Sequence, residues 1–201
     1  MNYFLRISSF IFHPLLIPLF GAVLYYTITP KYIEPDLIQA KILAIIIITI
    51  LIPLVTFFLL KNLNFVESIN LVHVSERKYP LMIQALLILL IIKMVYSAYE
   101  TPELYYFFIG VLFSILTALI LVYFKIKISL HLMGISGFTM FLIALSVHFK
   151  INLLFIIGFF FFCIGWVGTS RLHTKSHTFP ELILGCFLGI IPQFIILPYW
   201  L

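Results

Sequence analysis

Long apolar runs alternate with short polar turns along the whole chain. A helix needs ~20 mostly apolar residues to cross the hydrocarbon core of a bilayer, and the apolar runs have about that length. They predict spans at about residues 7–29, 42–60, 81–99, 104–124, 132–147, 153–167 and 182–201. The pattern therefore predicts an all-α, polytopic integral membrane bundle of six to seven transmembrane helices.

Three local patterns add detail to these spans. The longest polar stretch, residues 61–80, contains spaced apolar side chains and predicts a short interfacial helix. The first run contains Pro14 and Pro18 and lacks a small-x-small cleavage site, so we expect a retained span rather than a signal peptide. In the last span, Gly185 and Gly189 have the spacing that allows close helix contact.

The composition agrees with a membrane location. Of the 201 residues, 64% are hydrophobic and 9% are charged, whereas soluble domains contain roughly 45–50% apolar and ~25% charged residues. The formal net charge of +5 suits anionic lipid headgroups in a chain of this kind. We therefore expect a lipid bilayer as partner, no nucleic acid, and one helical domain over residues 1–201.

Three polar clusters contain most of the reactive side chains, around Arg77, His131 and His177. Two predicted spans separate the first cluster from the second, and two more separate the second from the third. An even number of crossings returns a chain to the same membrane face, so all three clusters should lie on one surface. There the helix ends could form a single site.

The two histidines are a candidate acid and nucleophile pair. Imidazole titrates near pH ~6.5, so a neutral His177 could attack phosphorus while His131 protonates the leaving oxygen. Glu181 could orient the ring of His177. It could instead close an S/T-x-x-E capping box with Thr178 at the start of the last span.

Cations near these histidines could hold a phosphoryl group, because guanidinium and ammonium groups bind phosphate oxygens. Candidates are Arg77, Lys78, Lys127 and Arg171, although cations also flank membrane spans for other reasons. The hydroxyls of Ser129 and Ser170 could add hydrogen bonds, and Ser129 could equally be a plain helix N-cap.

Several histidines in one chain could instead bind a metal ion. The chain has neither an H-E-x-x-H motif nor paired acidic residues beside the histidines, so we expect no metal site and no cofactor. We expect a structural role for His13, which stands beside Pro14.

The third cluster resembles a signature of the type 2 phosphatidic acid phosphatase family, S-R-x-x-x-x-x-H-x-x-x-D. Ser170, Arg171 and His177 match it at the same spacing, and Glu181 stands where the family has Asp. The second family motif, P-S-G-H, corresponds to residues 128–131, in which Ser129 and His131 are kept.

The first family motif, K-x-x-x-x-x-x-R-P, is matched through Arg77. The lysine position falls on Asn70, for which Lys78 or Lys127 could substitute, and the proline comes at Pro80 rather than directly after the arginine. The motif-bearing part thus begins at about residue 70 and extends into the last span, over about residues 70–201.

The resemblance implies a helical membrane fold and a metal-independent lipid phosphatase. In such an enzyme His177 forms a phosphohistidine, His131 protonates the leaving group, and water hydrolyses the intermediate. The expected substrate is a membrane lipid with a phosphate or pyrophosphate headgroup. The same residues leave open a non-catalytic lipid-phosphate binding or transport protein, and a lipid phosphotransferase that uses an alcohol in place of water.

Membrane orientation has two opposing indications. The predicted motif face holds eight cations, namely Arg6, Lys61, Arg77, Lys78, Lys125, Lys127, Arg171 and Lys175, and the opposite face holds four, namely Lys31, Lys41, Lys93 and Lys150. Positive-inside counting places the motif face in the cytoplasm. The resemblance instead implies a bacterial inner membrane with the site on the extracytoplasmic face, and we follow the resemblance.

Overall fold

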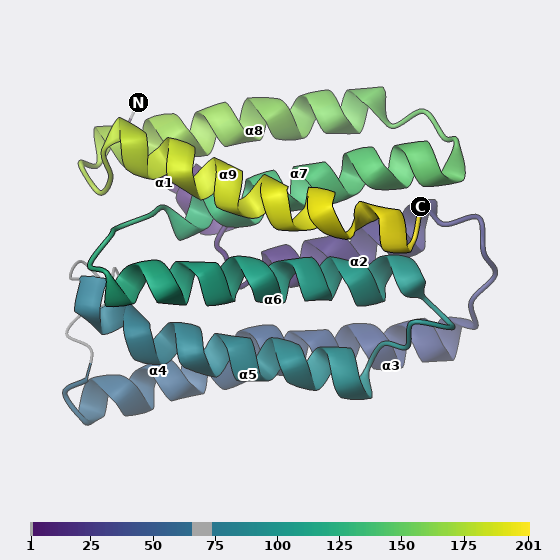
Figure 1. The fold of residues 1–201 in the computed structure, drawn as a ribbon, viewed down its shortest axis with the longest axis horizontal. Coiled ribbons are helices and arrows are strands. Elements are labelled where there is room, and N and C mark those ends of the chain that lie inside the picture. Colours follow the sequence, from purple (N-terminus) through teal and green to yellow (C-terminus); the bar gives the residue numbers. More distant parts are fainter. Residues whose placement is uncertain (1, 66–73) are drawn as a thin grey trace.

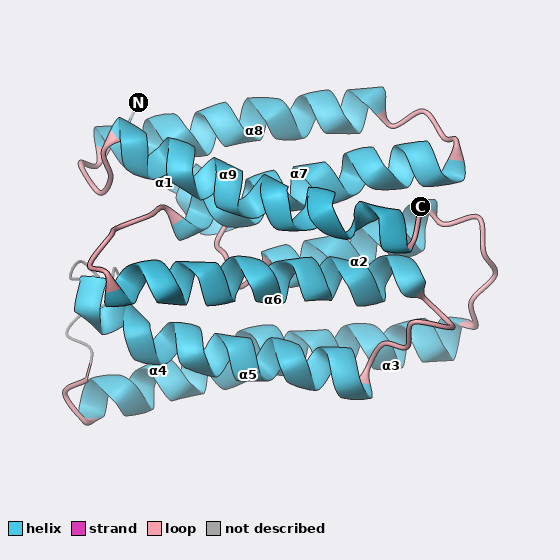
Figure 2. Cartoon of the chain, in the orientation of Figure 1, coloured by secondary structure: helices cyan, strands magenta, loops and turns pink. Residues whose placement is uncertain are grey.

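The computed structural model describes residues 2–65 and 74–201, in which every element is helical and none is a strand (Figures 1 and 2). The α-helices are α1 (Asn2–Ile11), α2 (Ile17–Ile28), α3 (Pro35–Ile46), α4 (Ile52–Asn62), α5 (Lys78–Met94), α6 (Pro102–Tyr123), α7 (Leu130–Phe149), α8 (Leu154–His173) and α9 (Phe179–Ile196). A π-helical turn, Ile47–Leu51, joins α3 and α4, and short 3-10 turns, Val74–Arg77 and Leu197–Tyr199, precede α5 and follow α9.

Five helices of the described part are long and apolar enough to cross a membrane. They are Pro35–Asn62, Pro102–Tyr123, Leu130–Phe149, Leu154–His173 and Phe179–Tyr199. The expected all-helical membrane protein is thus confirmed at this level. The helices run side by side along the long axis of the molecule (Figure 1).

The first apolar run is two helices rather than the single span that the sequence predicted. Pro14 has no N–H to donate and disfavours helix at the residue before it. The chain turns here, with the Leu16 N–H donating to the His13 oxygen at 2.8 Å. As a result α1 packs on α8, whereas α2 packs on α3, α6 and α7.

Two other boundaries differ from the predicted ones. Helix α8 continues to His173, beyond the predicted end of this span at about residue 167, so Ser170 and Arg171 lie on its last turns. The predicted interfacial helix in residues 61–80 falls mostly on residues 66–73, which lie outside the described residues, as does Asn70. Of its described ends, residues 61–62 complete α4 and residues 74–77 form the 3-10 turn.

Helices α7 and α9 make the closest approach in the bundle. A Cβ atom added to Gly189 would lie 2.2 Å from the Met133 oxygen, and one added to Gly185 would lie 2.6 Å from the Ser129 oxygen. Glycine is therefore required at both positions for backbones to meet. This contact sets the start of α7 directly beside the start of α9.

A buried carboxylate joins three helices at the end of the bundle where α2 and α7 finish and α6 begins. Glu103 is fully buried and accepts hydrogen bonds from Lys31 Nζ at 2.5 Å and Tyr25 Oη at 3.0 Å. The His148 Nε2 lies 3.2 Å from the same carboxylate. These partners neutralise the charge that burial would otherwise destabilise.

The 3-10 turn Val74–Arg77, the segment 124–129 and the segment 174–178 all lie at the other end, together with the N-terminus (Figure 1). The predicted convergence of the three polar clusters on one end of the bundle therefore agrees with the structure.

Candidate active site

His177 lies in the turn between α8 and α9, with its side chain only 2% exposed. Its Nδ1 is 2.6 Å from Oε2 of Glu181, one turn further on in α9. A carboxylate can only accept, so Nδ1 carries the proton in this pair and Nε2 keeps its lone pair. The lone pair on Nε2 is the one that a nucleophilic imidazole uses.

Glu181 makes this contact instead of the alternative capping arrangement. Thr178 stands at the N-cap of α9 but makes no side-chain capping bond in the described structure. The backbone oxygen of Glu181 accepts the Ser129 N–H at 3.2 Å. Glu181 therefore links His177 to the start of α7 through both its side chain and its backbone.

The charge state of His177 follows from its surroundings. Burial, together with the charges of Arg77 and Arg171, lowers the pKa of His177 to about 4, although the hydrogen bond that it donates to Glu181 acts in the opposite direction. The imidazole is therefore neutral at pH 7. A neutral ring with a free Nε2 is the form that can attack an electrophile.

Two arginines provide positive charge beside this ring. Arg77 is buried, and its Nη1 donates to the Ile128 oxygen at 2.7 Å. Burial lowers the pKa of Arg77, but guanidinium remains protonated in proteins. Arg171 acts electrostatically on both His177 and His131, and its buried Nε has no hydrogen-bond partner among the described residues.

The second histidine, His131, lies on the first turn of α7. Its Nε2 is 3.1 Å from the Ser9 backbone oxygen, so Nε2 carries a proton that it donates to this carbonyl. The ring packs edge-on against His13, with centroids 5.4 Å apart. The N-terminal segment thus contributes directly to the surroundings of His131.

The two serines have structural partners. The Ser129 Oγ accepts the Leu132 N–H at 3.4 Å, which makes Ser129 the N-cap of α7, as one of the two predicted readings had it. Its hydroxyl proton is still available to a ligand. The Ser170 Oγ is 3.0 Å from the Ser9 Oγ.

The two predicted lysines are placed differently. Lys127 Nζ donates to the Ser176 oxygen at 2.9 Å and so fixes the turn that contains His177. Lys78 instead contacts an aromatic ring: its Nζ lies 4.8 Å from the ring centroid of Tyr123, at the end of α6. Within the described part of the chain, no group of three or more His, Cys, Asp or Glu side chains could hold a metal ion.

Sequence reasoning did not identify Ser9 as a partner of the site, and it gave His13 no more than a structural role. Both lie more than a hundred residues from His131 in the chain, and only packing of α1 against α8 brings them near. The one signal in the sequence was the His13-Pro14 step, which interrupts an otherwise apolar run.

Comparison of the chain with models of known protein families, with curated proteins and with solved structures found no match. The chemistry of the site therefore follows from its side chains. A neutral buried imidazole, a carboxylate on its far nitrogen, two guanidinium groups and a second imidazole are suited to transfer of a phosphoryl group.

Proposed function

We propose that this protein is a metal-independent membrane lipid phosphatase, which hydrolyses a phosphate or pyrophosphate headgroup through a phosphohistidine intermediate. The observation that carries the proposal is the His177–Glu181 pair, joined at 2.6 Å, with the charges of Arg77 and Arg171 acting on the same imidazole. Each group has a role in one reaction.

In the first step, Nε2 of His177 attacks phosphorus and the bond from phosphorus to the leaving oxygen breaks. The leaving oxygen takes a proton from the imidazolium form of His131, which becomes a neutral ring, and the phosphoryl group stays on Nε2 of His177. The imidazole of His177 becomes positively charged, because Nδ1 keeps its proton. Glu181 stabilises this charge through the hydrogen bond that it already accepts.

In the second step, His131, now unprotonated at that nitrogen, takes a proton from water as the water oxygen attacks phosphorus. The P–N bond breaks, inorganic phosphate leaves and His177 returns to the neutral form. Before substrate binds, the Nε2–H of His131 donates a hydrogen bond to the backbone oxygen of Ser9. Transfer from Nε2 therefore requires the substrate oxygen to replace the Ser9 oxygen as its acceptor.

The cations act on charge that develops at phosphorus. Arg77 and Arg171 stabilise the phosphoryl oxygens during transfer, and the unpartnered Nε of Arg171 is one donor for them. The hydroxyl of Ser129 donates to another oxygen. Ser170 and Lys127 position the site, through Ser9 and through the turn before α9.

The membrane setting supports a lipid rather than a soluble substrate, because the site lies at one end of a bundle of apolar helices. We propose that α5 also crosses the bilayer, and that the split pair α1 and α2 together makes one more crossing, which with the five long helices gives seven, the upper value of the predicted six to seven. We further propose a bacterial inner membrane, with the site on the extracytoplasmic face.

The deciding experiment measures phosphate release by the purified protein in detergent with a chelator present. The substrates are a panel of lipid phosphates and pyrophosphates, and His177→Ala is compared with wild type. We expect release by wild type and none by the variant. The matched control is His173→Ala, which removes an exposed histidine from the last turn of α8. This variant should keep activity.

Release that persists in a folded His177→Ala protein would contradict the mechanism. Binding of lipid phosphates without any release by wild type would favour the lipid-phosphate binding or transport protein that the sequence leaves open. An alkylated phosphate product in the presence of an alcohol would identify a phosphotransferase.

A further inference from the structure

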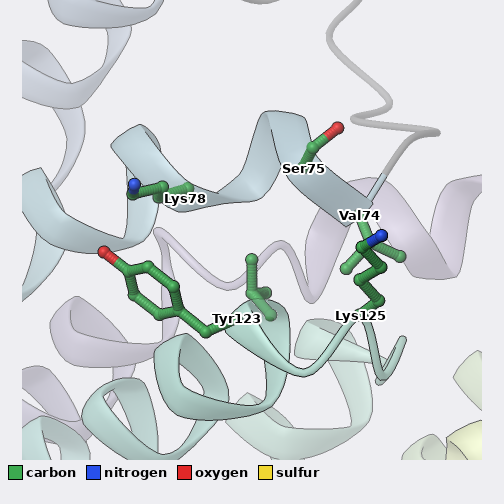
Figure 3. A pocket seen from close by; sticks show the side chains of 6 residues that line it. Val74, Ser75, Lys78, Tyr123 and Lys125 are labelled. Atoms are coloured by element: carbon green, nitrogen blue, oxygen red, sulfur yellow. The ribbon is translucent and has the colours of Figure 1, made fainter.

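A cavity opens at the same end of the bundle as the histidine site, between the start of α5 and the end of α6. Its volume is about 360 Å³, within the size range of small-molecule sites. Figure 3 shows its walls, and the lining residues are Val74, Ser75, Lys78, Val122, Tyr123 and Lys125. We call it the lysine pocket.

The lysine pocket has two lysines among its lining residues and no carboxylate. Lys78 and Lys125 come from its two walls (Figure 3), and neither forms an ion pair within residues 2–65 and 74–201. The ammonium of Lys78 is held over the ring of Tyr123, 4.8 Å from its centroid. Two cations that share one cavity repel each other, so an anion between them would be stabilised.

This pocket is separate from the histidine site. Arg77 and Lys78 are consecutive, yet Arg77 donates to Ile128 on the histidine side while Lys78 lies against Tyr123 on the other. These two consecutive residues thus contact different partners. Neither His131 nor His177 lines the lysine pocket.

We propose that the lysine pocket binds the phosphate group of an anionic membrane lipid. Lys78, Lys125 and the hydroxyl of Tyr123 would contact the phosphate, and Val74 and Val122 provide apolar surface for the adjoining part of the lipid. The pocket lies at the end of the apolar helix α6, where lipid headgroups meet such a helix. Free phosphate presents the same chemical group and is the alternative source of the ligand.

The test measures retention of phosphatidylglycerol by native mass spectrometry, after extraction from phosphatidylcholine vesicles with and without phosphatidylglycerol. All proteins carry His177→Ala, so that chemistry at the histidine site cannot affect the result. Compared with that parent, Lys78→Gln with Lys125→Gln should weaken retention about thirtyfold, because a lysine near an anionic membrane surface contributes ~1 kcal/mol.

A matched control removes the same charge from the same end of the bundle. Lys61→Gln with Lys175→Gln changes two exposed lysines outside the pocket and should leave retention within about twofold of the parent. Thermal unfolding of each variant verifies that it is folded.

Equal retention by the Lys78/Lys125 variant and the Lys61/Lys175 control would overturn the proposal. So would displacement of the lipid by inorganic phosphate as effectively as by added phosphatidylglycerol, since the pocket would then be a free-phosphate site. Because binding is measured without turnover, either result stands whether or not the protein is a phosphatase.

Discussion

The imidazole of His177 is subject to opposing effects that together set its reactivity. Burial and two arginines lower its pKa to about 4, and the Glu181 carboxylate, 2.6 Å away, acts against them. Protonation would remove the nucleophile only as the pH falls through this value, below the usual range near 6.5. The site can therefore hold a neutral nucleophile beside two cations, which suits an anionic substrate.

Replacing Glu181 tests how much this carboxylate contributes. In Glu181→Gln the amide oxygen can still accept the Nδ1 proton, but it lacks the charge that stabilises phosphorylated His177. We expect kcat for phosphate release to fall by at least about a hundredfold. The pKa of His177 should fall further, because Glu181 raises it, so the loss at pH 7 cannot come from protonation of His177.

Glu181→Asp is the companion variant, because it keeps the charge and shortens the side chain by one methylene. It should recover part of the lost kcat, and the acid limb of kcat/KM should stay below pH ~6.5. A Glu181→Gln protein with the kcat of wild type would mean that Glu181 serves only to hold α9 against α7.

At the scale of elements, apolar periodicity predicted most helices but not how they are interrupted or where they meet. The runs later called α6, α7 and α9 begin within about three residues of their predicted starts. The break at Pro14 was not predicted because residues 10–12 and 15–20 on its two sides are all apolar and read as one continuous span. The Ser9 contacts with His131 and Ser170 were not predictable, since they depend on tertiary packing that local sequence does not encode.

The contact of α9 with α7 gives a direct stability test. Gly189→Ala places a methyl group 2.2 Å from the Met133 backbone oxygen, and overpacking of this kind costs about 1–3 kcal/mol. We expect a lower midpoint of thermal unfolding in detergent, and weaker activity because α9 positions Glu181.

Gly165→Ala on α8 is the control for the change in helix propensity. A Cβ there meets nothing within 4 Å, and alanine is favoured over glycine within a helix by up to about 1 kcal/mol. This variant should be as stable as wild type or more so. Equal destabilisation by both alanines would show that α7 and α9 do not meet through Gly189.

At the scale of the whole molecule, the two ends of the bundle differ in how charge is balanced. At one end Glu103 is surrounded by Lys31, Tyr25 and His148, so its negative charge is balanced by partners within the fold. At the other end the two lysines of the lysine pocket form no ion pair with a carboxylate of residues 2–65 or 74–201, and the histidine site holds two arginines. An excess of cations beside a bilayer suits anionic headgroups.

The same cations make orientation a test of the proposed function. If all of these cations determine orientation, the positive-inside rule places the motif end in the cytoplasm. If Arg77, Lys78 and Arg171 instead bind ligands, five cations remain on the motif face against four on the opposite face, and the bias nearly disappears. We expect the extracytoplasmic orientation. It can be measured with Lys175→Cys and Lys150→Cys, made in a background without Cys163 and Cys186.

Both probe positions are exposed and have the same left-handed backbone, with φ of 52° and 54°, so they should react equally well where reagent reaches them. A membrane-impermeant maleimide added to intact bacterial cells that produce the protein should label Lys175→Cys and leave Lys150→Cys unlabelled until the membrane is opened. The reverse pattern would place the histidines in the cytoplasm. The lipid phosphate would then have to be presented from the inner leaflet, and the charge count would have been the correct guide.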